Sequence, residues 1–380
     1  MVPTERISDL NPVSRAVYEG TVVADLALRT ALSSVITGAM IPWGITRDLR
    51  AENRRLGFYR DLAAEKDAAK VFHPPPRVDV KTVPRGVRVP MLGGHRDAEI
   101  LRFSSPYVAR NPVVRSDYGR HSRNRIAWAQ HWRHTDGPRP TLCVIHGFGA
   151  SPYWLNSAFF ALPYFFGRGY DVLLYTMPFH GLRRGMLTPV NGTELFAHGV
   201  AHLNEAIIHA VHDFRVFLDY LERTGVDRVG LTGLSLGGYM TSLLAAVEPR
   251  LRFVIPNAAV TDMRSLIRSW FPTNQLISAV TKLRNAPRDD IEKSLAVHSP
   301  LNYRPVVPKN RMLIIGGLGD RLAPPEQSEQ LWLHWDEPRI HWFVGNHVLH
   351  LSRGAYLREM RRFLEAAFSD DDRLSAAATP

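Results

Sequence analysis

A serine in a sharp turn between a predicted strand and a predicted helix is the strongest constraint in this sequence. Residues 228–232 form a short β-prone apolar stretch, and residues 238–247 are apolar with helical spacing. Between them, Gly233 and Gly237 flank Ser235 in a Gly-x-Ser-x-Gly pattern. So tight a turn holds the serine hydroxyl clear of the backbone, and the positive end of the following helix dipole points at it. The pattern predicts a nucleophilic serine at the C-terminal edge of a sheet.

A base and an orienting acid for this serine are predicted further along the chain. A serine hydroxyl is a weak nucleophile until a base takes its proton, and the base needs an acid to orient it. Residues 311–317 read as a buried strand that ends in a Gly/Pro turn with Asp320. Residues 340–344 read as a strand that leads to His347. We interpret Ser235 as the nucleophile, His347 as the base and Asp320 as the orienting acid.

Each of these assignments has an alternative. His350 follows the predicted base closely and is a rival for its role. Asp262 follows another strand-like run, residues 253–260, and is a rival acid. Asp320 alternatively caps a turn or the helix after it, as aspartates in such turns usually do. His347 is alternatively an ordinary surface-loop histidine.

A glycine-rich turn after a further buried strand supplies candidates for an oxyanion hole. Residues 141–145 read as that strand, and His146, Gly147 and Phe148 follow it. Glycines let the backbone approach a substrate closely, and acyl transfer needs two amide donors aimed at the developing oxyanion. The predicted donors are the N–H groups of Phe148 and Leu236, with His146 and Gly147 as supporting residues. The alternative is a tight turn without a function.

The order of these motifs resembles that of the α/β-hydrolase superfamily of serine hydrolases. The resemblance covers residues 125–368, and Phe179 stands where the family usually has a glycine. It rests on five segments, at residues 146–149, 178–181, 233–237, 316–320 and 345–347. It implies a mostly parallel central sheet with helices on both faces, a Ser-Asp-His triad, and hydrolysis through an acyl-enzyme without a cofactor or metal.

The resemblance leaves several activities open within the superfamily. Carboxylic esters, including lipid-like acyl esters and thioesters, are the substrates that we expect. Because the superfamily also contains acyltransferases and the fold alone does not decide the reaction, an acyltransferase with the same triad is one alternative. A non-catalytic member of the fold that binds at a membrane surface is another.

The chain is predicted to divide into three parts. Residues 1–75 read as a helical extension, which a proline-rich break separates from a hydrolase domain at residues 76–368. Within that domain, residues 261–300 interrupt the alternation of strands and helices with bulky apolar residues. We interpret this insertion as a helical cap that favours acyl chains; ordinary packing at the sheet edge is the alternative. Residues 369–380 are predicted to be a disordered tail.

The extension contains an apolar stretch, residues 22–41, with a regular polar interruption. The interrupting residues are four positions apart, so in a helix they form one narrow stripe beside a broad apolar face; they are Asp25, Arg29, Ser33 and Thr37. Such a helix usually docks on the body of its own protein, and a membrane surface or a partner is the alternative.

The chain is basic, with a formal net charge of +11. The basic residues concentrate at 47–60 and 110–133, and they either form a solvated surface or attract the headgroups of an anionic membrane. Nucleic acid is not expected, because no helix-turn-helix, zinc spacing or aromatic platform accompanies the charge. The chain opens on no signal-peptide pattern and has no uninterrupted run of 18 apolar residues. We therefore expect a cytoplasmic protein, with contact at the membrane periphery as an option.

Four histidines and a glutamate fall on one face of the helix predicted at residues 199–223. They are His198, His202, Glu205, His209 and His212. Because apolar residues occupy the opposite face, we interpret the histidine face as a solvated one turned away from the core. A metal site is the alternative, although no His-Glu-x-x-His motif is present.

Overall fold

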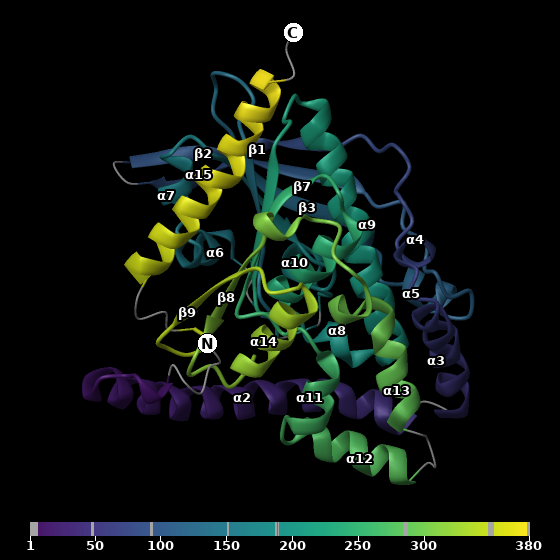
Figure 1. The fold of residues 1–380 in the computed structure, drawn as a ribbon. Helices are drawn as coiled ribbons and strands as arrows, with labels where there is room; N and C mark the ends of the chain where they lie inside the picture. Colours follow the sequence, from purple (N-terminus) through teal and green to yellow (C-terminus); the bar gives the residue numbers. More distant parts are fainter. Residues whose placement is uncertain are drawn as a thin grey trace.

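A nine-stranded sheet organises the part of the chain that the computed structural model describes, which is residues 7–46, 49–91, 94–149, 152–186, 188, 190–283, 288–348 and 353–377 (Figure 1). The strands are β1 (Lys81–Met91), β2 (Gly94–Ser104), β3 (Ile126–Trp132), β4 (Thr141–Ile145), β5 (Asp171–Thr176), β6 (Val229–Leu234), β7 (Leu251–Asn257), β8 (Leu313–Gly317) and β9 (Arg339–Phe343). Their order across the sheet is β1-β2-β3-β5-β4-β6-β7-β8-β9.

The sheet is parallel from β5 to β9 and antiparallel at its β1 end. Neighbouring strands run parallel in the series β5-β4-β6-β7-β8-β9, whereas the β1–β2, β2–β3 and β3–β5 pairs are antiparallel. Since the C-terminal ends of parallel strands meet at one edge, the turns after β4, β6, β8 and β9 lie together there. This arrangement confirms the mostly parallel α/β-hydrolase sheet that the sequence predicts.

Helices cover both faces of the sheet. Every residue of the central strands β4 and β5 is therefore buried. Alternate residues of β4 enter two separate cores: Cys143 and Ile145 enter one, whereas Leu142 and Val144 enter the other. The first core is covered by α3 (Leu49–Ala64), α4 (Ala68–Val71), α9 (Val200–Arg223), α10 (Leu236–Val247) and α14 (Pro325–His334). The second is covered by α6 (Tyr153–Phe159), α7 (Leu162–Phe166) and α15 (Arg353–Ala377).

The N-terminal extension begins with a single long helix, α2 (Pro12–Thr46), which crosses below β8, β9 and α8 (Glu194–Ala197) in Figure 1. The sequence predicts that this helix docks on the protein but leaves open which of its faces does so. The helix docks on the body of its own protein, but the polar stripe faces inward and many apolar side chains face outward. Of the stripe, Asp25 and Ser33 are fully buried. The exposed apolar residues of the helix include Val13, Val23, Leu26, Leu28, Val35 and Ile41.

The physical reason for this orientation is the surface on which α2 docks. The hydroxyl groups of Ser33 and Thr37 both bond Thr273, at 2.8 and 2.9 Å. Asp25 accepts the backbone N–H of Arg321, at 2.7 Å. Buried polar groups of loops need partners, and the polar stripe supplies them. By length and composition alone, residues Pro12–Pro42 also form a helix that is long and apolar enough to cross a membrane.

Residues 261–300 form the predicted helical insertion, with α11 (Met263–Ser269), α12 (Thr273–Leu283) and α13 (Arg288–Leu295). Trp270 and Ile277 of this insertion are buried against Ile36 and Met40 of α2. The insertion and the extension therefore share one small hydrophobic core, which also contains Leu322 from the turn after β8.

The C-terminal end differs from the expected disordered tail. Helix α15 continues to Ala377, so most of the segment predicted as a tail is helical, and residues 378–380 lie outside the described residues.

Candidate active site

Ser235 stands in a strained turn between β6 and α10. Its backbone has φ 57° and ψ −113°, in a region that non-glycine residues rarely adopt. A side chain at Gly237 would collide with the carbonyl oxygen of Ile145 in β4, and one at Gly233 would collide with the carbonyl group of Gly237. Only glycines therefore let the start of α10 approach β4 and β6 closely enough to form this turn.

Asp320 and His347 meet across the turns that follow β8 and β9. His347 Nδ1 lies 2.7 Å from Asp320 Oδ2, and both side chains are buried. The second oxygen, Oδ1, accepts the backbone N–H groups of Leu322 at 2.9 Å and Ala323 at 2.7 Å. Because these donors fix the carboxylate, it can orient the imidazole with its proton on Nδ1, leaving Nε2 free to act as a base.

The electrostatics of the pair favour the charged form of the imidazole. Burial lowers the pKa of His347, but the charge of the Asp320 carboxylate, its hydrogen bond and the charge of the Asp25 carboxylate together outweigh burial. The net shift of the His347 pKa is therefore upward. The imidazolium that forms when a base takes a proton is therefore stabilised at this position.

The rival residues are not brought into this pair. The Asp262 carboxylate accepts the guanidinium of Arg264, at 2.7 Å, rather than an imidazole. His350 lies outside the described residues. Within the described residues, no hydrogen bond joins Ser235 Oγ to His347, and such bonds often form only when substrate is bound.

The glycine-rich turn after β4 lies beside the serine. A Cβ atom at Gly147 would be 3.6 Å from the Cβ of Ser235. His146 fixes this turn: its Nδ1–H donates to the Gly147 carbonyl at 2.9 Å, while its Nε2 accepts the N–H of Met177 at 3.2 Å. Burial lowers the pKa of His146 to about 4, so the ring is neutral at pH 7. These two hydrogen bonds are compatible with the supporting role that the sequence predicts for His146.

Two backbone donors at this edge have no acceptor among the described residues. They are the N–H groups of Phe148, in the turn after β4, and of Leu236, at the first position of α10. The first N–H groups of a helix have no intrahelical partner, so the one at Leu236 is available to an external oxygen.

An apolar pocket of about 50 Å³ lies between α2 and the helical insertion. The Phe148 ring packs on Phe196, 5.6 Å between centroids, and Phe196 lines the pocket. The pocket therefore adjoins the turn after β4. Further lining residues are Ile36, Met40, Leu203, Met263, Ile267, Trp270 and Ile277.

The histidine face of α9 is buried, and the expectation of a solvated face is wrong. His202, Glu205 and His209 are all buried. The Glu205 carboxylate accepts the hydroxyl of Tyr59 at 2.6 Å, the hydroxyl of Tyr107, and the N–H groups of Arg110 and Asn111. Helix α3 and the segment after β2 cover this face, which periodicity within α9 does not reveal.

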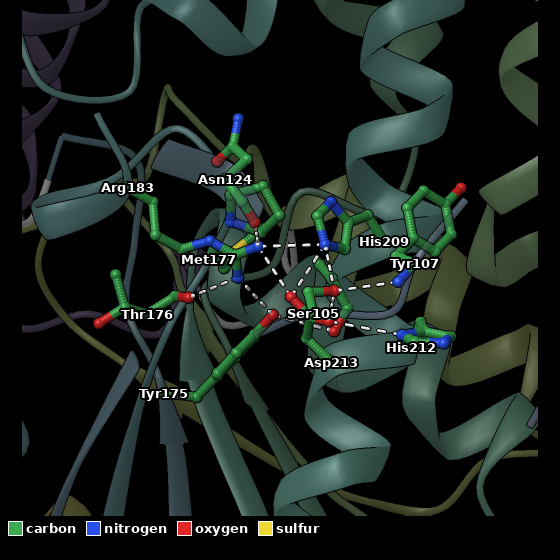
Figure 2. Close-up of polar contacts among 12 residues, drawn as sticks. Ser105, Tyr107, Asn124, Tyr175, Thr176, Met177, Arg183, His209, His212 and Asp213 are labelled. Atoms are coloured by element: carbon green, nitrogen blue, oxygen red, sulfur yellow. Dashed lines mark hydrogen bonds and ion pairs between the residues drawn. The ribbon is translucent and has the colours of Figure 1, made fainter. Parts of the chain in front are cut away.

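A polar network on this face contains serine, histidine and aspartate, but it is not arranged as a triad (Figure 2). Ser105 Oγ lies 2.9 Å and Asp213 Oδ2 lies 3.0 Å from the same nitrogen of His209, Nε2. Ser105 Oγ itself donates to Asp213, at 2.5 Å. Arg183 pairs with Asp213 at 2.7 Å, and both side chains are fully buried. These contacts indicate a structural network. Among the described residues, no group of three or more metal-ligating side chains is placed to hold an ion.

Two family descriptions match parts of this chain. Residues 205–334 match the Prolyl oligopeptidase family, and residues 101–265 match Alpha/beta hydrolase domain containing 18. The chain is also 30% identical, over 274 residues, to uncharacterized protein Rv2627c of Mycobacterium tuberculosis strain ATCC 25618 / H37Rv. The same values hold for uncharacterized protein MT2702 of strain CDC 1551 / Oshkosh. The match covers 68% of this chain but only 60% of each of these curated relatives.

Solved structures of two esterases share the fold. Acetyl xylan esterase 1 from Thermoanaerobacterium sp. JW/SL YS485 aligns with a TM-score of 0.54 and 18% identity, over 82% of this chain and 93% of that one. Acetyl xylan esterase from Paenibacillus sp. R4 aligns with a TM-score of 0.52 and 15% identity, over 81% and 94%. At these identities the likeness establishes the fold alone.

Proposed function

This chain belongs to the α/β-hydrolase superfamily, and from that premise we propose that it is a serine hydrolase that cleaves carboxylic esters through an acyl-enzyme on Ser235. The observation that carries the proposal is the buried hydrogen bond between His347 Nδ1 and Asp320, 2.7 Å long. A buried, oriented imidazole at the same sheet edge as a serine in a strained turn is an arrangement for nucleophilic catalysis.

The proposed reaction has two halves. Ser235 Oγ attacks the ester carbonyl carbon while His347 Nε2 takes the serine proton, and the carbonyl oxygen becomes an oxyanion. The oxyanion accepts the N–H groups of Phe148 and Leu236, which have no acceptor within the described part of the chain. When the intermediate collapses, the alcohol leaves with the proton from His347. Water then attacks the acyl-enzyme with the same base, which releases the acid and restores Ser235.

The test is labelling with a fluorophosphonate probe, which forms a covalent bond only with an activated serine. We expect wild-type protein to be labelled at Ser235, with the site identified by mass spectrometry, and the Ser235→Ala variant to be unlabelled. The matched control is Ser34→Ala, which removes the hydroxyl group of an exposed serine in α2. Equal labelling of wild type and Ser235→Ala, or no labelling of the folded wild type, would contradict the proposal.

For the substrate class, we propose esters with an apolar acyl group. The apolar pocket beside Phe148 supports this assignment, because a hydrophobic lining favours an acyl chain over a polar one. The measurement is kcat/KM for p-nitrophenyl esters of increasing chain length. Trp270→Ala enlarges the pocket and should shift the preference toward longer chains, whereas Trp154→Ala, an exposed tryptophan outside the lining, should not. Adding acceptor alcohols and analysing the products separates hydrolysis from acyl transfer.

For location, we propose that the protein works in the cytoplasm with the outward face of α2 resting on an anionic membrane. The support is the combination of exposed apolar residues, such as Val23 and Val35, with a net charge of +11. A Val23→Asp/Val35→Asp variant should co-sediment less with phosphatidylserine vesicles than wild type does. Leu333→Asp changes an exposed apolar residue of α14 and is the control. Equal co-sedimentation of all three proteins would contradict this placement.

A further inference from the structure

One carboxylate of the N-terminal extension lies against both turns that carry the proposed acid and base. Asp25, in α2, is fully buried. Its Oδ2 accepts the backbone N–H of Arg321 at 2.7 Å and the backbone N–H of His347 at 3.2 Å. Arg321 directly follows Asp320, so a single oxygen joins the backbone beside the acid to the backbone of the base.

Several other contacts hold α2 in this position. Asn346, next to the base, donates its side-chain N–H to the carbonyl of Thr21 at 3.2 Å. A Cβ atom at Gly319 would lie 2.9 Å from Thr21 Oγ1 and 2.7 Å from the Gly345 carbonyl oxygen. The glycine therefore permits close approach of the helix and both turns, which indicates that the three segments form one packed unit.

The charge of Asp25 is not cancelled by its neighbours. Its other oxygen, Oδ1, has no hydrogen-bond partner among the described residues. Two guanidinium groups lie nearby but are directed elsewhere: Arg321 donates to a tyrosine hydroxyl of α2 and Arg29 to the Arg321 carbonyl. The titratable groups that face His347 are thus Asp320 from the β8 turn and Asp25 from α2.

We propose that Asp25 is a positioning residue of the active site, which holds the His347 backbone in register with Asp320 and adds a second negative charge that stabilises the His347 imidazolium. The inference rests on the proposed function, because the imidazolium forms when His347 takes the proton of Ser235. A buried carboxylate with one oxygen that accepts no hydrogen bond reduces the stability of the folded protein. Such groups are tolerated where they support function. The N-terminal extension thereby becomes part of the catalytic unit.

The variant that tests this is Asp25→Asn, which keeps the size of the side chain and an oxygen acceptor but removes the charge. Its matched control is Glu19→Gln, which removes a negative charge from an exposed position of the same helix. The first readout is the rate of fluorophosphonate labelling at Ser235 as a function of pH. The second is the titration of the His347 ring, followed by NMR in the absence of any substrate or probe.

Loss of the Asp25 charge should lower the His347 pKa, so the base stays neutral to lower pH. We expect the acid limb of the labelling profile, and the NMR midpoint, to move down by about 1 pH unit, the lower end of the range for a neighbouring charge. We expect the plateau rate to fall about tenfold, because the imidazolium is less stabilised in the transition state. Glu19→Gln should match wild type in both readouts.

The two readouts separate failure of the inference from failure of the proposed function. If wild type is labelled at Ser235 and Asp25→Asn has the wild-type midpoint and plateau, the positioning role is overturned while the hydrolase proposal stands. If folded wild type is not labelled, the hydrolase proposal fails, and the NMR midpoint alone decides whether Asp25 acts on His347. If Asp25→Asn does not fold, Asp25→Glu replaces it: a retained midpoint with a lowered plateau supports the inference, and an unchanged plateau overturns it.

Thermal unfolding distinguishes this role from a merely structural one. Burial raises the pKa of Asp25, so the ionised carboxylate destabilises the folded protein at neutral pH. Asp25→Asn removes that cost, and we expect its melting temperature at pH 7 to equal or exceed that of wild type. The difference should shrink as pH falls through the raised pKa, because the wild-type carboxyl is then also neutral. A lower melting temperature at pH 7, together with a wild-type NMR midpoint and labelling plateau, would indicate that Asp25 serves only to hold the fold together.

Discussion

Replacing Asp320 with asparagine tests the role of the proposed acid without changing the shape of the site. Oδ1 of Asp320 accepts two backbone N–H groups, those of Leu322 and Ala323. These donors require an oxygen at that position, so the amide of Asp320→Asn keeps its oxygen there and turns its NH2 group toward His347. The ring nitrogen Nδ1 must then accept a hydrogen bond instead of donating one.

The consequence for the rate follows from the tautomer. With Nδ1 as an acceptor, the His347 proton moves to Nε2, and the ring cannot take a proton from Ser235 at neutral pH. Loss of the carboxylate also removes the charge that stabilises the imidazolium. In the Ser-His-Asp template this change lowers kcat by about 10⁴, which is about 5.4 kcal/mol at 1.36 kcal/mol per factor of ten.

The assay is turnover of p-nitrophenyl acetate, with the urea midpoint of unfolding measured in parallel to show that the variant is folded. The control is Asp262→Asn, which changes the rival acid; since its carboxylate bonds Arg264, we expect activity within about twofold of wild type, as for most surface substitutions. The reasoning is refuted if folded Asp320→Asn keeps more than a tenth of wild-type kcat, or if Asp262→Asn loses as much activity as Asp320→Asn does.

Three further predictions follow from contacts described above. Gly237→Ala should unfold at lower urea concentration and lose activity, because its methyl group collides with a backbone carbonyl of β4, whereas Gly38→Ala, in open space on α2, should be at least as stable as wild type. Arg183→Met should destabilise the fold by about 3–5 kcal/mol in urea unfolding, because it leaves Asp213 buried without its cation, and Asp213→Asn in the same chain should recover part of that loss. Activity should fall as pH is lowered through the raised pKa of His347, with a midpoint above 6.5, and a midpoint below 6.5 would contradict the assigned electrostatics.

Local signals were sufficient to predict the turns in which the candidate site residues stand. Gly233 and Gly237 identify the turn at Ser235, because no other residue fits those positions. Asp320 and His347 were predicted from their places just after strand-like runs, since the C-terminal ends of parallel strands share one edge. The same logic placed the turn after β4, at Gly147, beside the serine. These positions depend on local sequence and on the topology of the sheet, both of which a single sequence can indicate.

Tertiary packing decided what the sequence did not reveal. The pattern of α2 predicts a docked helix but does not say which face docks, and Asp25 and Ser33 are buried because the surface beneath them is polar. Likewise, the sequence pattern predicts a solvated face of α9 at Glu205, yet a distant helix and Tyr107 cover it. The periodicity of polar and apolar residues along one helix shows which of its faces is polar. It does not show whether the surface that packs against that face is polar too.

The docking of α2 joins a helix of the N-terminal extension to turns that come much later in the sequence. The bonds from Asp25 and Thr21 reach 296 to 325 residues ahead in sequence. Contacts of such long range form late in folding, since most of the chain must be in place first. During synthesis, α2 therefore leaves the ribosome long before the residues of its docking surface have been made. Undocking of this helix, which leaves the central sheet intact, should be the first step by which mild denaturant or heat silences the enzyme.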